Sequence, residues 1–333
     1  MAKHKVVLYN TEGVGTTIEE QVLTNGKYDN FNLIRIDGDN DERFFAEAQN
    51  ADGVIIVYLK TDREALSKLK SCKVLTIHAI GVNNIDLKAA TEFGICIGNV
   101  PDYCIEEVAT HTVGMALDCA RKITQLDRSV REGKWDVYAA GKMYRTKGRT
   151  YGLVAFGNIP RRIAELLKPF GMKLVTYDPF VSDEILKQYG VERAESLESL
   201  FAQSDYISVH TPLLPTTRHL IGKELFDVIK PGAVVIATGR GGVIDEDALK
   251  AAIESGRVTA AAIDVIENEG AVTSPLMGMD QVIMTPHAAY YSEDSCDECR
   301  VKAMEQVVEV LEHKKLPRYL VNKDVDGVAR FQK

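Results

Sequence analysis

The chain lacks an excess of basic residues and any long apolar run, and each absence excludes a class of protein. Its 333 residues include 40 Lys and Arg against 48 Asp and Glu, a formal net charge of −8. Nucleic acids and anionic membranes bind basic faces, so neither is expected as the main partner. No apolar run is long enough to span a membrane, and the first residues, MAKHKVVLYN, enter a strand pattern rather than a signal peptide. We therefore expect a cytoplasmic protein.

Cysteine is also sparse, which bears on redox chemistry and metal binding. The six cysteines are scattered over the chain: Cys72, Cys96, Cys104, Cys119, Cys296 and Cys299. In a cytoplasmic protein of this size, reduced thiols are the default. Cys296 and Cys299 form a CxxC in a helical pattern, and no second Cys or His pair accompanies them. Two ordinary helical thiols are therefore favoured over a redox or metal site, and no metal is expected.

The chain does contain a regular alternation of strand and helix patterns, with the 45% hydrophobic and 26% charged residues of an ordinary globular protein. Its length allows two domains, each with its own core. Between residues 5 and 100, short β-rich runs such as FNLIRI and GVIIVYL alternate with helical pieces such as DERFFAEAQN. This alternation predicts an α/β domain of flavodoxin-like type, in which helices wrap a parallel sheet.

The most informative stretch is 151–179, YGLVAFGNIPRRIAELLKPFGMKLVTYDP, which has the pattern of one βαβ unit. A short strand, a turn at Gly157, a helix from about 160 to 170 and a second strand that ends in Asp178 follow one another. A pyrophosphate that approaches the backbone needs a turn residue without a side chain and the N–H groups of a helix N-terminus. An acid at the end of the second strand can accept both hydroxyls of an adenosine ribose. The unit is therefore predicted to bind a dinucleotide.

One detail of this unit indicates which dinucleotide it prefers, and another leaves open an alternative to dinucleotide binding. Asp178 would repel a 2′-phosphate, and residues 179–181 contain no Arg to bind one, so NAD is favoured over NADP. Where the usual motif has three glycines, this chain has Ala155, Gly157 and Pro160, and proline is accepted in a first helical turn. Because so degenerate a motif is weak by itself, an ordinary βαβ unit stays the alternative.

The rest of the chain completes the second domain and indicates how the protein assembles. The run IEEVATHTVGMALDCARKITQLDRSVREG predicts a long helix over 105–133, and the irregular residues 134–150 are expected to wrap over a neighbour. We therefore predict a homodimer formed through residues 102–150. The final helix, from about residue 294, is expected to return to the first domain, which lacks cover for one sheet face. The two predicted domains are residues 1–100 with 297–333, flavodoxin-like and substrate-binding, and residues 101–296, a Rossmann-type domain that binds NAD.

Sequence strings in a fixed order carry a resemblance to a known family. They are HAIGVNNID, the unit that ends at Asp178, ATGRGGVIDEDAL, AAIDVIENE and TPHAAYYSE. Together they resemble the D-isomer-specific 2-hydroxyacid dehydrogenases over roughly residues 6–325. TPHAAYYSE and NVPDYCIEEVATHT are most similar to the branch that contains the C-terminal-binding proteins, corepressors that keep the dehydrogenase fold. The resemblance implies a reversible hydride transfer between NADH and a small 2-oxo acid.

The resemblance also implies a catalytic set: Arg240 in TGRGG, Glu269 in IENEG and His287 in TPHAA. The chemistry asks for the same residue types. Arginine presents a planar cation suited to a carboxylate beside a carbonyl, and histidine is the natural proton donor near neutral pH, with a carboxylate to stabilise its charged form. Glu267 competes with Glu269 for that part. Without this context, the three residues would be a sheet-end salt bridge, a turn histidine and a solvated loop acid.

The remaining site residues divide into a substrate side and a cofactor side. The family's loop implies that the substrate carboxylate meets the backbone N–H groups of Ile80 and Gly81. Lys60, at a strand end beside this loop, is a candidate for a second anionic group, and His78 and Tyr290 are candidates to face the substrate. A solvated lysine and aromatic packing are the simpler explanations of Lys60 and Tyr290. The implied cofactor contacts are Gly157, Asn158, Ile159, Asp178, Thr211, Pro212, Thr217, Thr238, Gly239, Asp264 and Thr112.

Two classes of function stay open on the sequence. The favoured one is an NAD-dependent D-2-hydroxyacid dehydrogenase of small 2-oxo acids, with His287 as proton donor and acceptor. The alternative is a dinucleotide-sensing, corepressor-like interaction protein on the same fold, for which the sequence shows no clear peptide groove. A relative that acts on formate or phosphite is less favoured, because a paired His287 and Glu269 suit ketone chemistry better.

Overall fold

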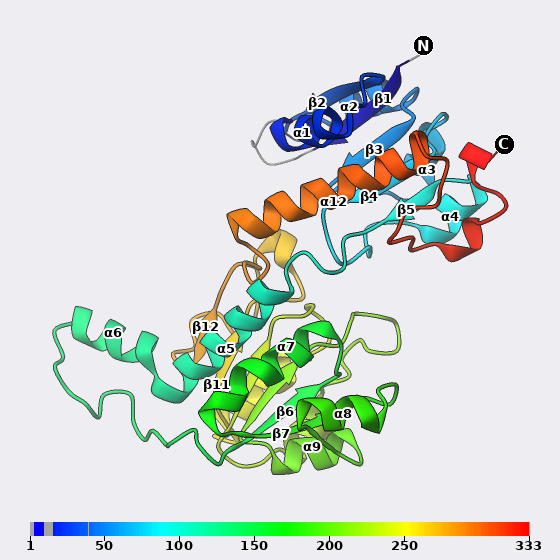
Figure 1. The fold of residues 1–333 in the computed structure, drawn as a ribbon. Helices are drawn as coiled ribbons and strands as arrows, with labels where there is room; N and C mark the ends of the chain where they lie inside the picture. The colour runs from blue at the N-terminus through cyan, green and yellow to red at the C-terminus, as the bar shows by residue number, and fades with distance from the viewer. Residues whose placement is uncertain (1–2, 10–15, 39, 333) are drawn as a thin grey trace. The chain divides into compact units, whose positions relative to one another are not determined.

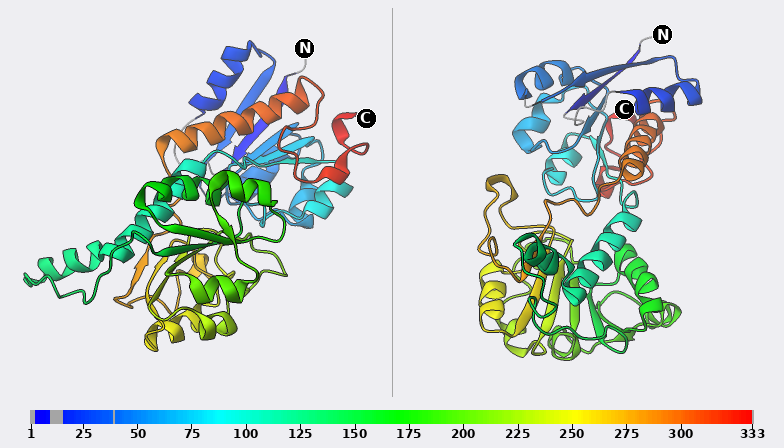
Figure 2. Two further views of the ribbon diagram at one scale, coloured as in Figure 1. Left: turned by 60° about the horizontal axis from the view of Figure 1, so that its bottom comes forward. Right: turned by 90° about the vertical axis from the view of Figure 1, so that its left-hand side faces the viewer.

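The structure, a computed structural model, describes residues 3–9, 16–38 and 40–332. The chain divides into two compact units, Met1–Tyr103 with Ser292–Lys333, and Cys104–Tyr291 (Figure 1). The sequence predicts these boundaries at 100/101 and 296/297. Each unit is a parallel sheet with helices on both faces (Figure 2), which confirms the predicted α/β fold class.

The first unit is built on a five-stranded parallel sheet with the order β2-β1-β3-β4-β5. Its strands are β1 (His4–Tyr9), β2 (Phe31–Ile36), β3 (Gly53–Ile56), β4 (Val74–Ile77) and β5 (Cys96–Gly98). All residues of β3 and β4 are buried, as expected for central strands that helices cover on both faces. Because β3 and β4 are parallel, the residues that follow them lie at one edge of the sheet, and His78 is the first residue after β4.

Two sets of helices cover the two faces of this sheet. The helices are α1 (Thr17–Gly26), α2 (Asp41–Ala48), α3 (Arg63–Lys68), α4 (Leu87–Glu92) and α12 (Glu293–Leu311). On one face α2 and α3 contribute Phe44 and Leu66 to the core. On the other face α1 and α12 contribute Leu23, Met304 and Val307. The long helix near the C-terminus, orange in Figure 2, thus completes the cover of the first sheet.

A buried ion pair joins the two helices of this second face. Arg300 of α12 donates from Nε and Nη2 to the two carboxylate oxygens of Glu19 of α1, at 2.8 and 2.6 Å. The two side chains are 7% and 0% exposed. Since desolvating such charges is costly, the pair depends on this two-point geometry, and loss of either partner would leave a buried charge alone.

The second unit is built on a seven-stranded parallel sheet with the order β12-β11-β10-β9-β6-β7-β8. Its strands are β6 (Thr150–Val154), β7 (Lys173–Tyr177), β8 (Glu192–Arg193), β9 (Tyr206–Val209), β10 (Ala233–Ala237), β11 (Val258–Ile263) and β12 (Val282–Met284). The strand order reverses at β6, which pairs with β7 on one side and β9 on the other. Parallel sheets bind ligands beyond the carboxyl ends of their strands at such a reversal.

Helices cover both faces of the second sheet as well. The helices of this unit are α5 (Ile105–Arg121), α6 (Ile123–Arg131), α7 (Asn158–Leu167), α8 (Asp183–Tyr189), α9 (Leu197–Gln203), α10 (Lys223–Val228) and α11 (Glu246–Glu254), and all but α6 pack on the sheet. One face packs against α5, α7 and α8, and the other against α9, α10 and α11. Short 3-10 helices are η1 (Lys168–Phe170), η2 (Glu269–Ala271), η3 (Lys323–Val325) and η4 (Arg330–Gln332). Of these elements and the strands, α8 and β8 were not predicted from the sequence.

The single long helix predicted over 105–133 is wrong. Lys122 adopts a left-handed conformation with φ 53°, which ends α5 and lets α6 start in a new direction. The carboxylate of Asp118 accepts the backbone N–H of Thr124 at 2.9 Å and so stabilises the start of α6. No residue of α6 is buried, and the helix projects away from the second sheet (Figure 1).

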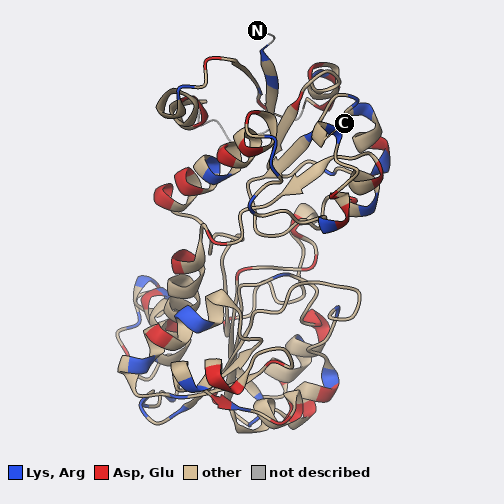
Figure 3. Cartoon of the chain, turned by 45° about the vertical axis from the view of Figure 1, so that its right-hand side comes forward, with Lys and Arg blue, Asp and Glu red and all other residues tan. Residues whose placement is uncertain are grey.

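The surface carries both signs of charge. Acidic and basic residues are interspersed along the helices of each unit (Figure 3). Among the described residues, no helix combines the length and the apolar character that crossing a bilayer requires. Within the same ranges, no three His, Cys, Asp or Glu side chains gather as they would around a metal ion.

All six cysteines are free thiols. Cys296 and Cys299 of the CxxC lie on α12, where Cys299 is buried. Burial raises the pKa of Cys72, Cys96 and Cys119 to about 12. These three thiols are therefore protonated and weakly nucleophilic at neutral pH.

His78 is a half-buried histidine of the first unit, and the fold keeps it neutral. Its Nε2 is buried and has no hydrogen-bond partner among the described residues. Burial lowers the pKa of His78 to about 4, with a smaller opposing effect from the charge of Glu19. The folded pKa thus lies below the unfolded value, so acid favours the unfolded chain, which takes up the proton first.

We expect His78 to make the protein acid-sensitive. Its contribution to the unfolding free energy is fully present above pH 6.5 and falls as the pH drops toward 4, by about 3 kcal/mol in all. Urea unfolding of the wild type and of His78→Gln at pH 7.5, 5.5 and 4.5 measures this. The variant should lose less stability between the first and last pH, while the control His313→Gln, at an exposed histidine, should follow the wild type. Equal losses in wild type and His78→Gln would contradict the assignment.

Candidate functional site

The turn between β6 and α7 has the features of a phosphate-binding turn. Gly157 is the N-cap of α7, and a Cβ built there would have no neighbour within 4 Å, so the space beside the turn is open. The helix starts at Asn158 rather than near Pro160, which puts the N–H groups of Asn158 and Ile159 in its first turn. An open helix N-terminus of this kind fits a pyrophosphate.

The left-handed residue of this turn is an alanine. Ala155 has φ 73°, whereas Gly157 has φ −75°. The backbone N–H of Ala155 donates to the carbonyl of Tyr177 at 3.0 Å, which ties the turn to the end of β7. Alanine in this conformation costs roughly 1–2 kcal/mol. A glycine at position 155, as in the usual motif, would adopt this backbone conformation without strain. Gly157 has no such need, and its lack of a side chain instead lets a ligand approach the backbone closely.

Asp178 lies beside the glycine turn, as its place in the sequence predicts. Its carboxylate accepts the backbone N–H groups of Phe156 and Phe180, each at 2.8 Å. These two bonds fix the carboxylate at the carboxyl end of β7, with the side chain half-buried. The residues present thus fit an adenosine ribose next to a pyrophosphate.

An arginine that the sequence analysis missed contacts the loop after Asp178. The guanidinium of Arg193, from β8, donates to the carbonyls of Asp178 and Val181 at 3.0 and 2.7 Å. Its Nε donates to Asp183 at 2.8 Å. Arg193 lies 15 residues after Asp178, so inspection of residues 179–181 could not find it. A cation is therefore fixed next to Asp178, the acid that the sequence predicts to disfavour a 2′-phosphate.

His287 lies on the turn that follows β12, and its partner is Glu269. Its Nδ1 is 3.0 Å from Oε2 of Glu269, and the two side chains are 35% and 45% exposed. This contact occupies one ring nitrogen and leaves Nε2 on the opposite side of the ring. His287 adopts φ 52°, a left-handed conformation that is uncommon for a non-glycine residue and typical of functional sites.

The charges around Glu269 keep it ionised. Burial raises the pKa of this carboxyl, but the hydrogen bond with His287 and the charges of His287 and Arg240 outweigh burial and leave the pKa below its ordinary value. Arg240 is half-buried, and its Nη1 donates to the carbonyl of Gly239 at 3.0 Å. The second unit therefore brings a guanidinium, an imidazole and an ionised carboxylate within electrostatic reach of one another.

The structure gives the neighbouring acid Glu267 other partners. Its carboxylate is 3.0 Å from Arg218 and 2.7 Å from His219. Its backbone N–H donates to the buried carboxylate of Glu246 at 2.6 Å. The two acids that compete on the sequence thus face different groups, and the partner of His287 is Glu269.

Asp264 is bound to the turn of His287 rather than open to a ligand. The side chain is buried, and its carboxylate accepts the backbone N–H groups of Ala288 and Ala289 at 2.8 and 3.0 Å, together with the hydroxyl of Thr285. Its backbone carbonyl accepts the N–H of His287 at 2.8 Å. Asp264 thus accepts four hydrogen bonds, and together they fix the conformation of the 285–289 turn.

A glycine next to Arg240 permits a close approach that the sequence analysis did not note. A Cβ built on Gly241 would lie 1.9 Å from the carbonyl oxygen of Ile266, so no other residue fits without moving the backbone. This approach joins the loop of Arg240 to the loop that carries Glu269. The second glycine of TGRGG, Gly241, is the feature of the sequence that could have indicated this close approach.

Three threonines expected at the cofactor have hydroxyls that bond within the protein. Thr217 donates to the carbonyl of Pro212 at 2.6 Å and accepts the N–H of Leu214 at 2.7 Å, which closes the 212–217 turn. Thr112 and Thr238 lie 2.8 Å apart, hydroxyl to hydroxyl. Thr211, Pro212 and Gly239 lie on the loops after β9 and β10, at the same edge of the sheet.

The expected substrate residues fall in both units. In the first unit, Asn99 donates to the carbonyl of Ile80 at 2.7 Å and so fixes the loop that also contains Gly81. Lys60 is 83% exposed and lies 3.6 Å from Asp62, an arrangement that a solvated surface lysine explains. His78 is the half-buried histidine described above, whose Nε2 is buried. In the second unit, the ring of Tyr290 meets that of His287 edge-on, with 6.1 Å between centroids.

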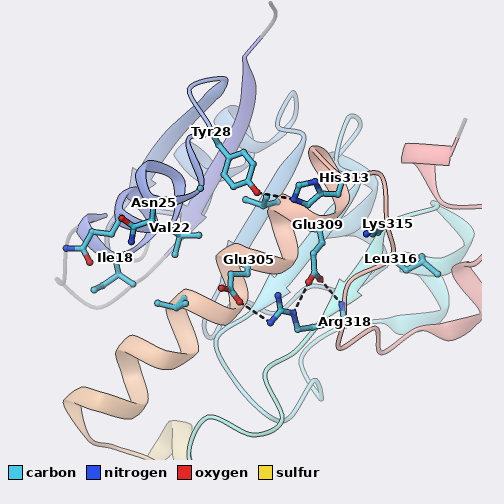
Figure 4. Close-up of a pocket in the computed structure, with 14 residues that line it drawn as sticks. Ile18, Val22, Asn25, Tyr28, Glu305, Glu309, His313, Lys315, Leu316 and Arg318 are labelled. Atoms are coloured by element: carbon cyan, nitrogen blue, oxygen red, sulfur yellow. Dashed lines mark hydrogen bonds and ion pairs between the residues drawn. The ribbon is translucent and has the colours of Figure 1, made fainter.

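A cavity of about 590 Å³ lies in the first unit between α1, α12 and the chain at 313–318 (Figure 4). None of the predicted site residues lines it. Its polar side chains pair with one another: Arg318 lies 3.0 and 2.8 Å from Glu305 and Glu309, and Tyr28 bonds His313 at 3.0 Å. The cavity is therefore separate from the candidate site.

Comparison with known proteins gives consistent matches. The sequence model of the D-isomer specific 2-hydroxyacid dehydrogenase family, NAD binding domain, matches residues 113–289. D-3-phosphoglycerate dehydrogenase of Methanocaldococcus jannaschii is 36% identical over 271 residues, 81% of this chain and 52% of that protein. The chain thus spans about half the length of the curated relatives it matches.

Solved structures extend the similarity to nearly the whole chain. D-lactate dehydrogenase from Escherichia coli superposes with a TM-score of 0.80 at 29% identity, over 95% of this chain and 99% of that one. D-mandelate dehydrogenase of Rhodotorula graminis superposes with a TM-score of 0.86 at 26% identity, over 96% and 98%. These matches do not single out the branch of the C-terminal-binding proteins. On the matched NAD-binding domain and the superposition over nearly the whole chain, the chain belongs to the D-isomer-specific 2-hydroxyacid dehydrogenase family.

Proposed function

We propose that the chain catalyses reversible hydride transfer between NADH and a small 2-oxo acid, with a D-2-hydroxy acid as the reduced product. The observation that carries the proposal is the 3.0 Å contact between His287 and Glu269 beside the charge of Arg240. An imidazole oriented by a carboxylate, next to a guanidinium, is what reduction of a carbonyl beside a carboxylate needs.

The protein's own residues would hold the cofactor at two points. The N–H groups at the start of α7, beside Gly157, would bind the pyrophosphate, and Asp178 would accept the ribose hydroxyls. When bound, NADH supplies the hydride. The phosphates would thus lie at the carboxyl end of β6, and the adenosine end at the carboxyl end of β7.

The acid–base part falls to three side chains. Arg240 binds the substrate carboxylate and polarises the carbonyl oxygen. Nε2–H of His287 donates a proton to that oxygen as negative charge develops on it, and Glu269 stabilises the imidazolium form beforehand. In the oxidation direction, Nε2 accepts the hydroxyl proton of the 2-hydroxy acid.

The second candidate, a corepressor-like interaction protein, is less well supported. A pure binding protein has no need for a histidine strained into a left-handed conformation against a carboxylate. The relatives named above are dehydrogenases of phosphoglycerate, lactate and mandelate, which supports catalysis. We also propose that the enzyme works in the cytoplasm, since all six of its cysteines are free thiols.

We further propose that a second copy of the chain covers α6 and the residues after it. Trp135, Tyr138 and Tyr144 are 92%, 80% and 60% exposed, and Ile123 of α6 is 59% exposed. Several large apolar side chains exposed along one segment of the chain are typical of an interaction surface. This segment lies within the residues 102–150 expected to form a homodimer.

His287 and Glu269 test the proposed reaction. A screen of NADH oxidation should find turnover with at least one of glyoxylate, pyruvate, hydroxypyruvate, phenylpyruvate or 3-phosphohydroxypyruvate. With that substrate, His287→Ala should lower kcat by about 10²–10⁴ and leave NADH affinity within about twofold. The control Glu267→Gln, on the same loop as Glu269, should keep most of the activity. Normal turnover by His287→Ala, or no turnover of any acid by the wild type, would refute the proposal.

Asp178 and Arg193 test the cofactor preference. Asp178→Ser removes the charge that repels a 2′-phosphate and leaves Arg193 in place, so NADPH affinity should rise at least tenfold relative to NADH. Arg193→Gln added to that variant should remove most of the gain. Fluorescence titration with each reduced cofactor measures both. An unchanged affinity ratio in Asp178→Ser would count against the role of this acid.

Sedimentation velocity tests the homodimer. The wild type should sediment as a dimer, and the double variant Trp135→Glu with Tyr138→Glu should sediment as a monomer, because two charges would be placed in an apolar interface. Val228→Glu, at a similarly apolar but unrelated surface position that is 43% exposed, is the matched control and should stay dimeric. A dimeric double variant would show that the interface lies elsewhere.

A further inference from the structure

His287 and Arg240 lie on different loops of the second unit, and one helix bonds both loops. His287 follows β12, and Arg240 follows β10. The left-handed conformation of His287 persists only where surrounding bonds maintain it. Two consecutive side chains of α5, His111 and Thr112, reach these loops.

His111 bonds the first residue of the His287 turn. Its Nε2 lies 3.1 Å from the hydroxyl oxygen of Thr285, and that hydroxyl also bonds the carboxylate of Asp264. The Thr285 hydroxyl donates its single proton to the Asp264 carboxylate, which also accepts two backbone N–H groups. His111 is then the donor, with its proton on Nε2. The same nitrogen lies 3.8 Å from Asp264, whose side chain is fully buried.

Thr112 bonds the loop that leads to Arg240. Its hydroxyl donates to the carbonyl of Val108 at 2.6 Å, and a carbonyl can only accept. The hydroxyl of Thr238, 2.8 Å away, is therefore the donor to Thr112. Both threonines are buried, and Thr238 stands two residues before Arg240. The bond thus connects α5 to the end of β10 without a solvent molecule between them.

The helix that carries both side chains is firmly packed. α5 has 17 residues, and Ala109, Val113 and Ala116 on it are buried in the core shared with α7 and with the sheet. Adjacent positions on such a helix keep a constant separation. A displacement of one loop relative to the other would therefore break a bond to α5.

We propose that His111 and Thr112 are positioning residues, and that α5 sets the distance between His287 and Arg240 by bonding Thr285 with one side chain and Thr238 with the next. Neither residue touches the reacting atoms. The catalytic consequence rests on the proposed dehydrogenase function, whereas the bonding itself does not.

Variants that remove single bonds test the proposal by activity. His111→Leu and Thr112→Val keep much of the side-chain volume and lose the polar contact, and each should lower kcat about ten- to a hundredfold with NADH affinity within about threefold. His111→Gln and Thr112→Ser restore a donor or hydroxyl and should recover most of the loss. Thr110→Val is the matched control, since Thr110 lies on the same helix, is exposed and bonds only carbonyls of α5. A kcat for His111→Leu equal to that of Thr110→Val, or no recovery in the conservative variants, would overturn the proposal.

Hydrogen exchange tests the bonding without any substrate. The amides of Ala288 and Ala289 donate to Asp264 and should exchange slowly in the wild type. We expect at least tenfold faster exchange in His111→Leu, recovery in His111→Gln and no change in Thr110→Val. If the wild type reduced no 2-oxo acid, the proposed function would fail while this measurement still decided the positioning role. Unchanged exchange in His111→Leu would refute that role.

Discussion

The buried carboxylate of Asp264 is the interaction on which the rest of the candidate site depends. It lies directly after β11 and accepts three hydrogen bonds from the 285–289 turn, while its carbonyl accepts a fourth. Removing this carboxylate would leave one buried and one partly buried amide without this partner, at a cost of about 1–3 kcal/mol for the buried one. The strained conformation of His287, and through it the contact with Glu269, is stable because these bonds outweigh the strain.

The cofactor end of the site depends on sheet topology instead. The glycine turn follows β6, where the strand order reverses, and Asp178 follows its neighbour β7. The loops of Arg240 and His287 follow β10 and β12 at the same edge of the sheet. A ligand bound at the reversal can therefore extend along that edge from Asp178 to His287, a common arrangement in parallel sheets.

The features of the fold that short stretches of sequence determine could be predicted from those stretches. Buried parallel strands are continuous apolar runs, so most strands of the two sheets could be predicted from their alternation with helical patterns, but the short, exposed β8 could not. The βαβ unit could be predicted from its turn and terminal acid. The end of α5 could not be read, because helical spacing continues through Lys122 although its backbone turns left-handed. The hydrogen bonds of Arg193 and Asp264 could not be predicted either, since they join segments that only the tertiary fold brings together. The choice between Glu269 and Glu267 depends on the groups that each carboxylate contacts, and sequence spacing does not reveal those contacts.

A crystal structure with NAD⁺ and oxamate, an unreactive isostere of a 2-oxo acid, tests the central claim most directly. We expect Nε2 of His287 to lie about 3 Å from the amide carbonyl oxygen of oxamate and the guanidinium of Arg240 to contact its carboxylate. Nδ1 of His287 should stay bonded to Glu269 in that complex. Oxamate bound away from these groups, or His287 turned toward another partner, would contradict the account.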